Sequence, residues 1–182
     1  KVKEELIQIC DILKNKEVYE TLGARMPSGV LLYGEPGLGK TLIAQCFIEE
    51  AGLMTYTLRK NKGNRDFIDE ISDTFKKAAQ NAPAIIFLDD MDKFANEDED
   101  HLDAEEYVAV QTGIDEVKNK NVFVIATVND IRKLPASLSR AGRFDRKIRM
   151  TAPDEGDAVK IVSHYLQDKN ISDDVDIKDL VK

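Results

Sequence analysis

The chain has 182 residues, of which 42% are hydrophobic and 33% charged, and its formal net charge at pH 7 is −8. This length suits one large domain, or one domain and part of another, with a substantial apolar core. The negative charge argues against a general nucleic-acid or acidic-membrane surface. No apolar run reaches the length of a membrane span and the first residues do not resemble a signal peptide, so we expect a soluble, cytoplasmic segment without membrane contact.

The two cysteines, Cys10 and Cys46, lie far apart in the sequence. They are not spaced as metal ligands usually are, and Cys46 falls within a predicted helix. We therefore expect two buried, reduced thiols rather than a disulfide, which fits a reducing compartment.

A phosphate-binding loop is the clearest motif. Residues 34–41 read Gly-Glu-Pro-Gly-Leu-Gly-Lys-Thr and match G-x-x-x-x-G-K-[ST] at every fixed position. The apolar run 29–33 suits a buried strand, and the apolar spacing over 42–48 suits a helix. Backbone N–H groups of such a loop bind a polyphosphate at the N-terminus of the following helix. Lys40 adds a charge for the outer phosphates, and Thr41 offers a hydroxyl to magnesium.

The residues expected to bind the nucleotide form one continuous stretch. They are Gly34, Glu35, Pro36, Gly37, Leu38, Gly39, Lys40, Thr41 and Leu42. A glycine-rich turn with an accidental Gly-Lys-Thr is the alternative interpretation, and the strand and helix patterns on either side argue against it. The glycine spacing also differs from the G-x-G-x-x-G of dehydrogenases.

Apolar runs alternate with helical patterns along the chain. Runs typical of buried strands follow at 54–58, 84–88, 122–126 and 147–150, in addition to 29–33. Helical spacing occurs at 2–13, 42–48, 67–79 and 107–117. This alternation predicts an α/β fold of the P-loop NTPase kind, with an open, mostly parallel five-stranded sheet and helices on both faces.

The last part of the chain has a different pattern. After Thr151 the spacing is helical only, as in Val159, Val162 and Leu166. We therefore divide the chain into a nucleotide-binding α/β domain at 1–150 and a partial helical subdomain at 151–182, and we expect the chain to belong to a longer protein.

An acidic stretch extends from Ala95 to Glu106. Such a charge run is more often a solvated loop than a site. The ligand spacing and the glycine of a calcium-binding EF-hand loop are missing, which argues against calcium.

A second chemical feature follows the third apolar run. Asp89 and Asp90 come directly after the run 84–88. In a nucleotide-hydrolysing sheet, one acid at this place can face the magnesium ion and its neighbour can polarise the attacking water. We assign the metal ligand to Asp89 and the water-polarising acid to Asp90, although strands also end in Asp for structural reasons alone.

The third feature reveals a resemblance. Residues 126–129 read Ala-Thr-Val-Asn, and residues 140–146 read Arg-Ala-Gly-Arg-Phe-Asp-Arg. With the phosphate loop and the acid pair, these motifs resemble the AAA ATPase module, most closely the ATPase domain of FtsH-type membrane-anchored proteases. The resemblance covers about Leu6 to His164.

The resemblance implies roles for individual residues. Asn129 would be the polar sensor near the γ-phosphate and the attacking water. Arg140 and Arg143 would be arginine fingers that reach the nucleotide of the next subunit in a ring, usually a hexamer, and stabilise charge in the transition state. His164 would contact the nucleotide from a helical lid, which the segment after Thr151 would begin. Surface ion pairs are the alternative interpretation of the two arginines.

The sequence departs from the family pattern at two places. Asp90 stands where most AAA enzymes have Glu, and this shorter acid predicts slow hydrolysis. The basic loop 59–65 is shorter than the FtsH-type substrate loop and has no aromatic residue, which argues against threading by the usual aromatic side chain. The only histidines are His101 and His164, so the segment has no His-Glu-x-x-His protease site.

We interpret the chain as a Mg²⁺-dependent ATPase that binds ATP or ADP and remodels or unfolds protein substrates as a ring homo-oligomer. One alternative is an ATP-binding regulatory or scaffolding module with vestigial hydrolysis. A further alternative is an ATPase that acts on nucleic acid through the loop 59–65, which the net charge of −8 disfavours.

Overall fold

The structure is a computed structural model that describes residues 2–61, 64–95, 104–138, 142–167 and 169. It divides into two units, Lys1–Met150 and Thr151–Lys182, and each is described by itself. Among the described residues, no helix has both the length and the apolar character needed to cross a membrane.

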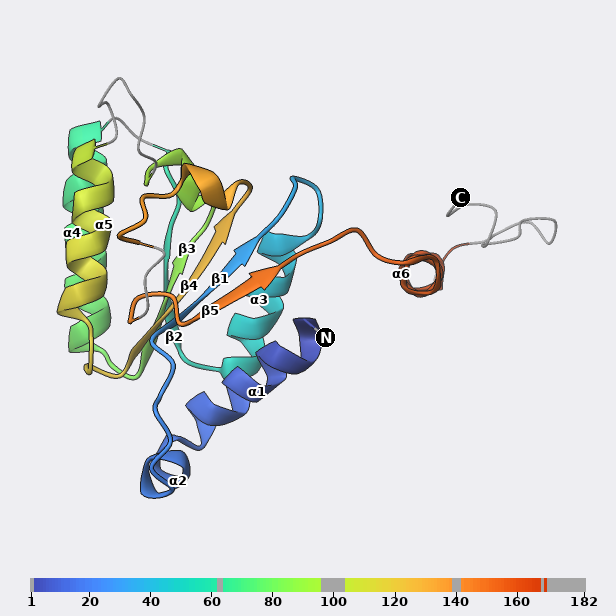
Figure 1. Cartoon of the computed structure of the whole chain (residues 1–182), viewed down its shortest axis with the longest axis horizontal. Coiled ribbons are helices and arrows are strands. Elements are labelled where there is room, and N and C mark those ends of the chain that lie inside the picture. The colour runs from blue at the N-terminus through green and yellow to red at the C-terminus, as the bar shows by residue number, and fades with distance from the viewer. Residues whose placement is uncertain (1, 62–63, 96–103, 139–141, 168, 170–182) are drawn as a thin grey trace. The chain divides into compact units, whose positions relative to one another are not determined.

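The first unit is built on one five-stranded sheet in which all strands run parallel (Figure 1). The strand order is β2-β3-β4-β1-β5. The strands are β1 (Gly29–Tyr33), β2 (Met54–Leu58), β3 (Ala84–Leu88), β4 (Val122–Val128) and β5 (Arg146–Arg149). This sheet confirms the predicted α/β fold class.

Helices cover both faces of the sheet, as Figure 1 shows. On one face lie α1 (Val2–Lys14) and α3 (Lys40–Ala51), and on the other lie α4 (Asn64–Gln80) and α5 (Ala104–Glu116). The short helix α2 (Lys16–Thr21) leads from α1 towards β1. Parallel strands need such crossover connections, which is why the predicted alternation of strands and helices gives this fold.

Alternate residues of each central strand supply two separate cores. In β3, Ile85 and Phe87 pack with Phe47 of α3 on one face, whereas Ile86 and Leu88 pack in the cluster of α4 and α5. Residues of a strand point to opposite faces in turn, so a strand that is buried on both sides must be apolar throughout. This explains the continuous apolar runs in the sequence.

The second unit contains one described helix, α6 (Glu155–Leu166). Its N-terminus is capped by Asp154, whose side chain accepts a hydrogen bond from the backbone N–H of Asp157 at 2.8 Å. The cap satisfies a donor that the helix itself cannot pair.

Two sequence predictions are wrong. Cys46 is exposed, because α3 faces the core with Ala44, Phe47 and Ala51.

The acidic stretch 95–106 is not all solvated loop. Helix α5 begins at residue 104, and Glu106 is fully buried, with its carboxylate 2.9 Å from the Lys60 ammonium. Residues 96–103 of the stretch lie outside the described residues.

The close contact between α4 and α5 predicts that replacing Gly113 destabilises the fold. A Cβ atom on Gly113 would lie 2.5 Å from the buried ring of Phe75. We expect Gly113→Ala to lower the free energy of unfolding by about 1–3 kcal/mol, although alanine is the better helix former. Urea unfolding measures this change. If the clash is the cause, Phe75→Leu in the Gly113→Ala background restores part of the loss; an undiminished loss would contradict it.

Candidate active site

The phosphate loop connects the end of β1 to the start of α3, and glycine is required by its geometry. Gly39 is the residue before the helix and has φ 76°, which side chains other than glycine rarely adopt. A Cβ atom on Gly34 would lie 2.4 Å from the carbonyl oxygen of Met150. The loop therefore turns tightly and approaches neighbouring backbone closely, with α3 beginning at Lys40.

Lys40 folds back onto its own loop. Its ammonium donates to the carbonyl oxygens of Gly34 and Glu35, each at 2.8 Å, and the residue is buried. Burial lowers the pKa of Lys40, while the charges of Asp90 and Asp92 act in the opposite direction. The charge predicted for the outer phosphates is thus held in place at the loop.

Asp89 joins the loop to the end of β3. This carboxylate is buried, and its Oδ1 accepts hydrogen bonds from Thr41 Oγ1 and Thr127 Oγ1, each at 2.9 Å. A threonine hydroxyl and a carboxylate are oxygen ligands of the kind that Mg²⁺ prefers. The donor set of Thr41 and Asp89 therefore fits the predicted magnesium ion.

Asp90 follows in a left-handed backbone conformation with φ 52°. Its N–H donates to Thr127 Oγ1 at 2.9 Å, which fixes the turn against β4. Its Oδ2 lies 2.7 Å from the ammonium of Lys93, in the short 3₁₀ helix η1 (Met91–Lys93). The guanidinium of Arg59 lies 3.6 Å from a carboxylate oxygen of each acid, Asp89 and Asp90.

Asn129 directly follows β4 at the same edge of the sheet. Its backbone N–H donates to Oδ2 of the buried Asp92 at 3.2 Å. Because β4 lies between β1 and β3, the structure brings Asn129 to the edge that holds the phosphate loop and the acid pair. Ligands of open α/β sheets bind at the carboxyl ends of the strands.

Arg143 is held within its own chain. Its guanidinium donates to both carboxylate oxygens of Asp115, at 3.1 and 2.5 Å, and to the carbonyl oxygen of Ser137. Its side chain is only 14% exposed. Arg140, the other predicted finger, lies outside the described residues. His164 lies on α6 in the second unit, and its predicted contact with the nucleotide stays a prediction.

Sequence reasoning missed the partners of these acids. Thr127 lies within the Ala-Thr-Val-Asn motif, yet its two hydrogen bonds follow from the pairing of β3 with β4. Arg59 directly follows β2, and the pairing of Leu58 with Leu88 brings it next to Asp89. The position of Arg59 directly after a strand is visible in the sequence. Its proximity to Asp89 could be inferred only once the strand order was known.

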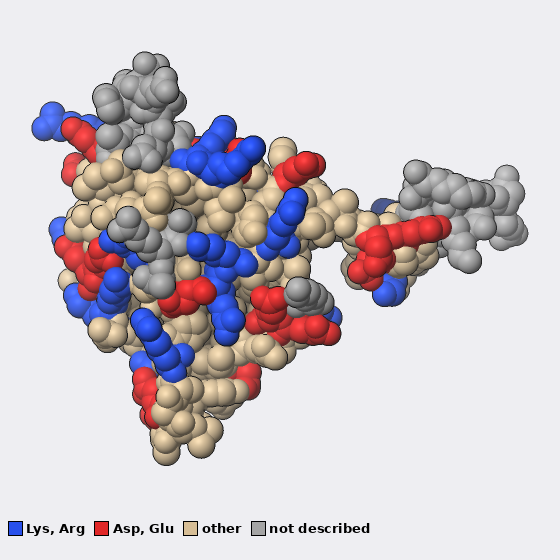
Figure 2. Space-filling view, in the orientation of Figure 1, with Lys and Arg blue, Asp and Glu red and all other residues tan. Residues whose placement is uncertain are grey.

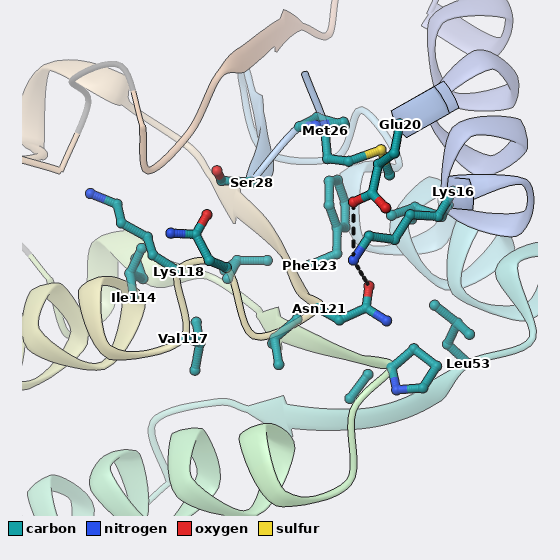
Figure 3. Close-up of a pocket in the computed structure, with 17 residues that line it drawn as sticks. Lys16, Glu20, Met26, Ser28, Leu53, Ile114, Val117, Lys118, Asn121 and Phe123 are labelled. Atoms are coloured by element: carbon teal, nitrogen blue, oxygen red, sulfur yellow. Dashed lines mark hydrogen bonds and ion pairs between the residues drawn. The ribbon is translucent and has the colours of Figure 1, made fainter. Parts of the chain in front are cut away.

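Two pockets lie away from this edge. One, of about 190 Å³, is lined by residues at the amino ends of the strands, including Ser28 and Val122. In it, the Lys16 ammonium lies 3.5 Å from the Glu20 carboxylate and donates to Asn121 Oδ1 at 3.1 Å (Figure 3). The other, of about 430 Å³, lies beside α1 and the start of β5. Neither includes a residue of 34–42.

Comparison with known sequences decides the family. The sequence profile of the "ATPase family associated with various cellular activities (AAA)" matches residues 30–152, which contain the phosphate loop, the acid pair and Arg143. This chain belongs to the AAA family. The match confirms the predicted AAA resemblance and the prediction of an ATPase.

Individual relatives of this AAA domain agree with that assignment. The chain is 35% identical to an ATP-dependent zinc metalloprotease FtsH of Ureaplasma parvum, with 100% of this chain and 26% of the relative covered. It is 36% identical to FtsH of Malacoplasma penetrans (99% and 23% covered) and 35% identical to FtsH 2 of Petrotoga mobilis (100% and 30%). The chain thus spans about a quarter of the length of these relatives.

The Asp115–Arg143 pair predicts a measurable titration. Hydrogen bonding from Arg143 lowers the pKa of Asp115, against the opposing effect of burial. A lowered pKa means that the pair stabilises the fold at neutral pH and that this contribution is lost as the pH falls through the folded-state pKa. We expect Arg143→Ala to raise the pKa of Asp115, measured by carboxyl NMR titration.

A second arginine–aspartate pair is the control for this titration. Arg132 lowers the pKa of Asp130 to about 2, so Arg132→Ala should raise that pKa and leave the pKa of Asp115 unchanged. An Asp115 pKa that does not respond to Arg143→Ala would show that the pair does not form in solution.

Proposed function

We propose that this AAA domain binds Mg²⁺-ATP in the loop 34–42 and hydrolyses it with Asp90 as the water-polarising acid. The observation that carries the proposal is the 2.9 Å hydrogen bond between Thr41 and Asp89, which joins the phosphate loop to the acid strand. The motifs alone give the residue types, whereas this contact supports their action at one site.

The proposal assigns a task to each residue of the candidate site. Thr41 and Asp89 would hold the magnesium ion, which supplies positive charge to the phosphate oxygens when bound. The backbone N–H groups of the loop and Lys40 bind the phosphates, so the ammonium has to exchange its carbonyl partners for phosphate oxygens. Asn129 orients the terminal phosphate and the attacking water.

The reaction is a transfer of the terminal phosphoryl group to water. The water oxygen bonds to the γ-phosphorus while the bond from that phosphorus to the β–γ bridging oxygen breaks, which releases ADP and phosphate. The water proton passes to the Asp90 carboxylate. Asp90 is held from two sides, through its N–H by Thr127 and through Oδ2 by Lys93, so its position at the end of β3 is defined.

We further propose that the domain works in a ring homo-oligomer in which Arg143, with Arg140, serves the site of the next subunit. In the single chain Arg143 is occupied by Asp115 and Ser137, so it has to leave these partners to act on another subunit. Hydrolysis would then depend on assembly.

The similarity to FtsH relatives supports a protein as the substrate. On the basis of the same similarity, we propose that this domain lies in the cytoplasm.

A nucleic-acid substrate has less support. Basic and acidic side chains are interspersed over the face shown in Figure 2, without a large field of one sign. The net charge is −8. Nucleic-acid binding depends mainly on clustered cations that neutralise phosphates.

A regulatory module that binds ATP and hydrolyses it slowly is the second candidate. The observation that favours it is the 2.7 Å ion pair between Lys93 and Asp90, which occupies the acid expected to polarise water. Turnover separates the candidates: a protein that binds ATP without hydrolysing it, and gains turnover in Asp90→Glu, would be a switch.

The proposed phosphate loop can be tested through nucleotide binding. Lys40→Ala should weaken ATP binding about a hundredfold or more, because it removes a buried ammonium at the phosphates. Isothermal titration with Mg²⁺-ATP measures the affinity. The matched control is Lys76→Ala, which removes an exposed lysine of α4. Equal ATP affinity of the Lys40 variant and this control would contradict the assignment of the phosphate loop.

The proposed intersubunit role of Arg143 can be tested through assembly. Arg143→Ala should leave ATP affinity unchanged and suppress the rise of turnover per subunit with protein concentration, because the side chain acts on another subunit's nucleotide. Turnover across a dilution series, with oligomer size followed by light scattering, tests this. If wild-type turnover per subunit stays constant through the assembly transition, the intersubunit role is wrong.

A further inference from the structure

Arg59 occupies a place at the candidate active site that none of the roles above includes. It is the first residue after β2, and the pairing of Leu58 with Leu88 sets it beside the acid pair. Its Nε lies 3.6 Å from Asp89 Oδ2, and its Nη2 lies 3.6 Å from Asp90 Oδ2. One guanidinium therefore bridges the acid predicted to hold magnesium and the acid predicted to polarise water.

These contacts leave the guanidinium of Arg59 able to donate hydrogen bonds to a ligand. A separation of 3.6 Å is an ion pair but exceeds the distance of a hydrogen bond. In the described part of the chain, the side-chain N–H groups of Arg59 make no hydrogen bond, and the side chain is 62% exposed. Arginine has five N–H donors arranged to match phosphate oxygens. Arg59 can thus move towards a phosphate without breaking a hydrogen bond.

Asp89 places Arg59 close to the phosphate loop. The two oxygens of this carboxylate face different partners: Oδ1 accepts from Thr41, and Oδ2 faces Arg59. Only one carboxylate group therefore separates the guanidinium from the loop hydroxyl. A triphosphate bound in the loop, with its terminal group towards the acid pair, brings phosphate oxygens into this neighbourhood.

Among the residues that the structure describes, three other cations at this site or predicted for it are already engaged. Lys40 donates to two loop carbonyls, Lys93 lies against Asp90, and Arg143 is bound by Asp115 and Ser137. Phosphoryl transfer needs positive charge that acts on the transition state. Within the described residues, Arg59 is a guanidinium that the same chain can supply there without disrupting a hydrogen bond.

We propose that Arg59 is a catalytic residue that binds the terminal phosphate of ATP within its own chain and stabilises the charge that develops during transfer. It forms and breaks no covalent bond, so the atoms balance as in the hydrolysis above. The proposal rests on the proposed ATP hydrolysis. It adds an arginine in cis to the arginines proposed to act between subunits.

The test compares Arg59→Ala with Arg65→Ala in the intact protein. Arg65, at the start of α4, is exposed and makes the matched change in charge. We expect Arg59→Ala to lower kcat about ten- to hundredfold, because a charge-assisted contact to the transition state is lost. Arg65→Ala should leave kcat unchanged.

A binding measurement separates this proposal from the proposed hydrolysis. In an Asp90→Asn background, which removes the water-polarising acid, Arg59→Ala should weaken ATP binding about tenfold and leave ADP binding unchanged. A wild type that binds no ATP would overturn both proposals. A wild type that hydrolyses ATP, beside an Arg59→Ala variant with unchanged kcat and an unchanged ATP-to-ADP affinity ratio, would overturn only the role of Arg59.

The direction of the change in kcat and an experiment with mixed oligomers complete the test. A rise of kcat in Arg59→Ala would show that Arg59 restrains Asp90 rather than aiding transfer, and would overturn the proposal. Mixed oligomers of Arg59→Ala and Asp90→Asn subunits should not regain turnover, because each site then lacks one of two residues that act in the same chain. Recovery in the mixture would show that Arg59 acts between subunits instead.

Discussion

The buried carboxylate of Asp89 connects the parts of the candidate active site. One of its oxygens accepts hydrogen bonds from Thr41 in the phosphate loop and from Thr127 in β4, and the other faces Arg59 after β2. An acid at this depth is stable only with such partners, because a buried charge without them is costly. The hydrogen bonds from Thr41 and Thr127 join the phosphate loop to the ends of β3 and β4, so the predicted chemistry depends on this one group.

The parallel sheet explains why these residues meet. Parallel strands place all their carboxyl ends at one edge, and the order β2-β3-β4-β1 brings Arg59, Asp89, Asn129 and the phosphate loop together there. The two apolar cores fix the sheet between its helices. The fold thus supplies rigid positions, and the residues after each strand supply the side chains of the candidate site.

Sequence reasoning identified the fold class because each strand appears as an apolar run and each helix as a period of apolar residues. It predicted the phosphate loop and the acid pair because both are contiguous motifs. It could not identify Thr127 or Arg59 as partners of Asp89, since their proximity depends on strand order rather than on spacing. Glu106 shows the same limit: its charge predicted exposure, but Lys60 from a distant loop pairs with it in the interior.

The measurement that tests the central claim most directly is Mg²⁺-ATP turnover by the intact protein beside its Asp90→Asn variant, with ATP affinity measured for both. The account predicts that wild type hydrolyses ATP and that the variant binds ATP with similar affinity but loses turnover, because the loop that binds phosphate is unchanged while the acid that polarises water is gone. Equal turnover in the two proteins would contradict the assignment of Asp90 and the hydrolytic site built around Asp89.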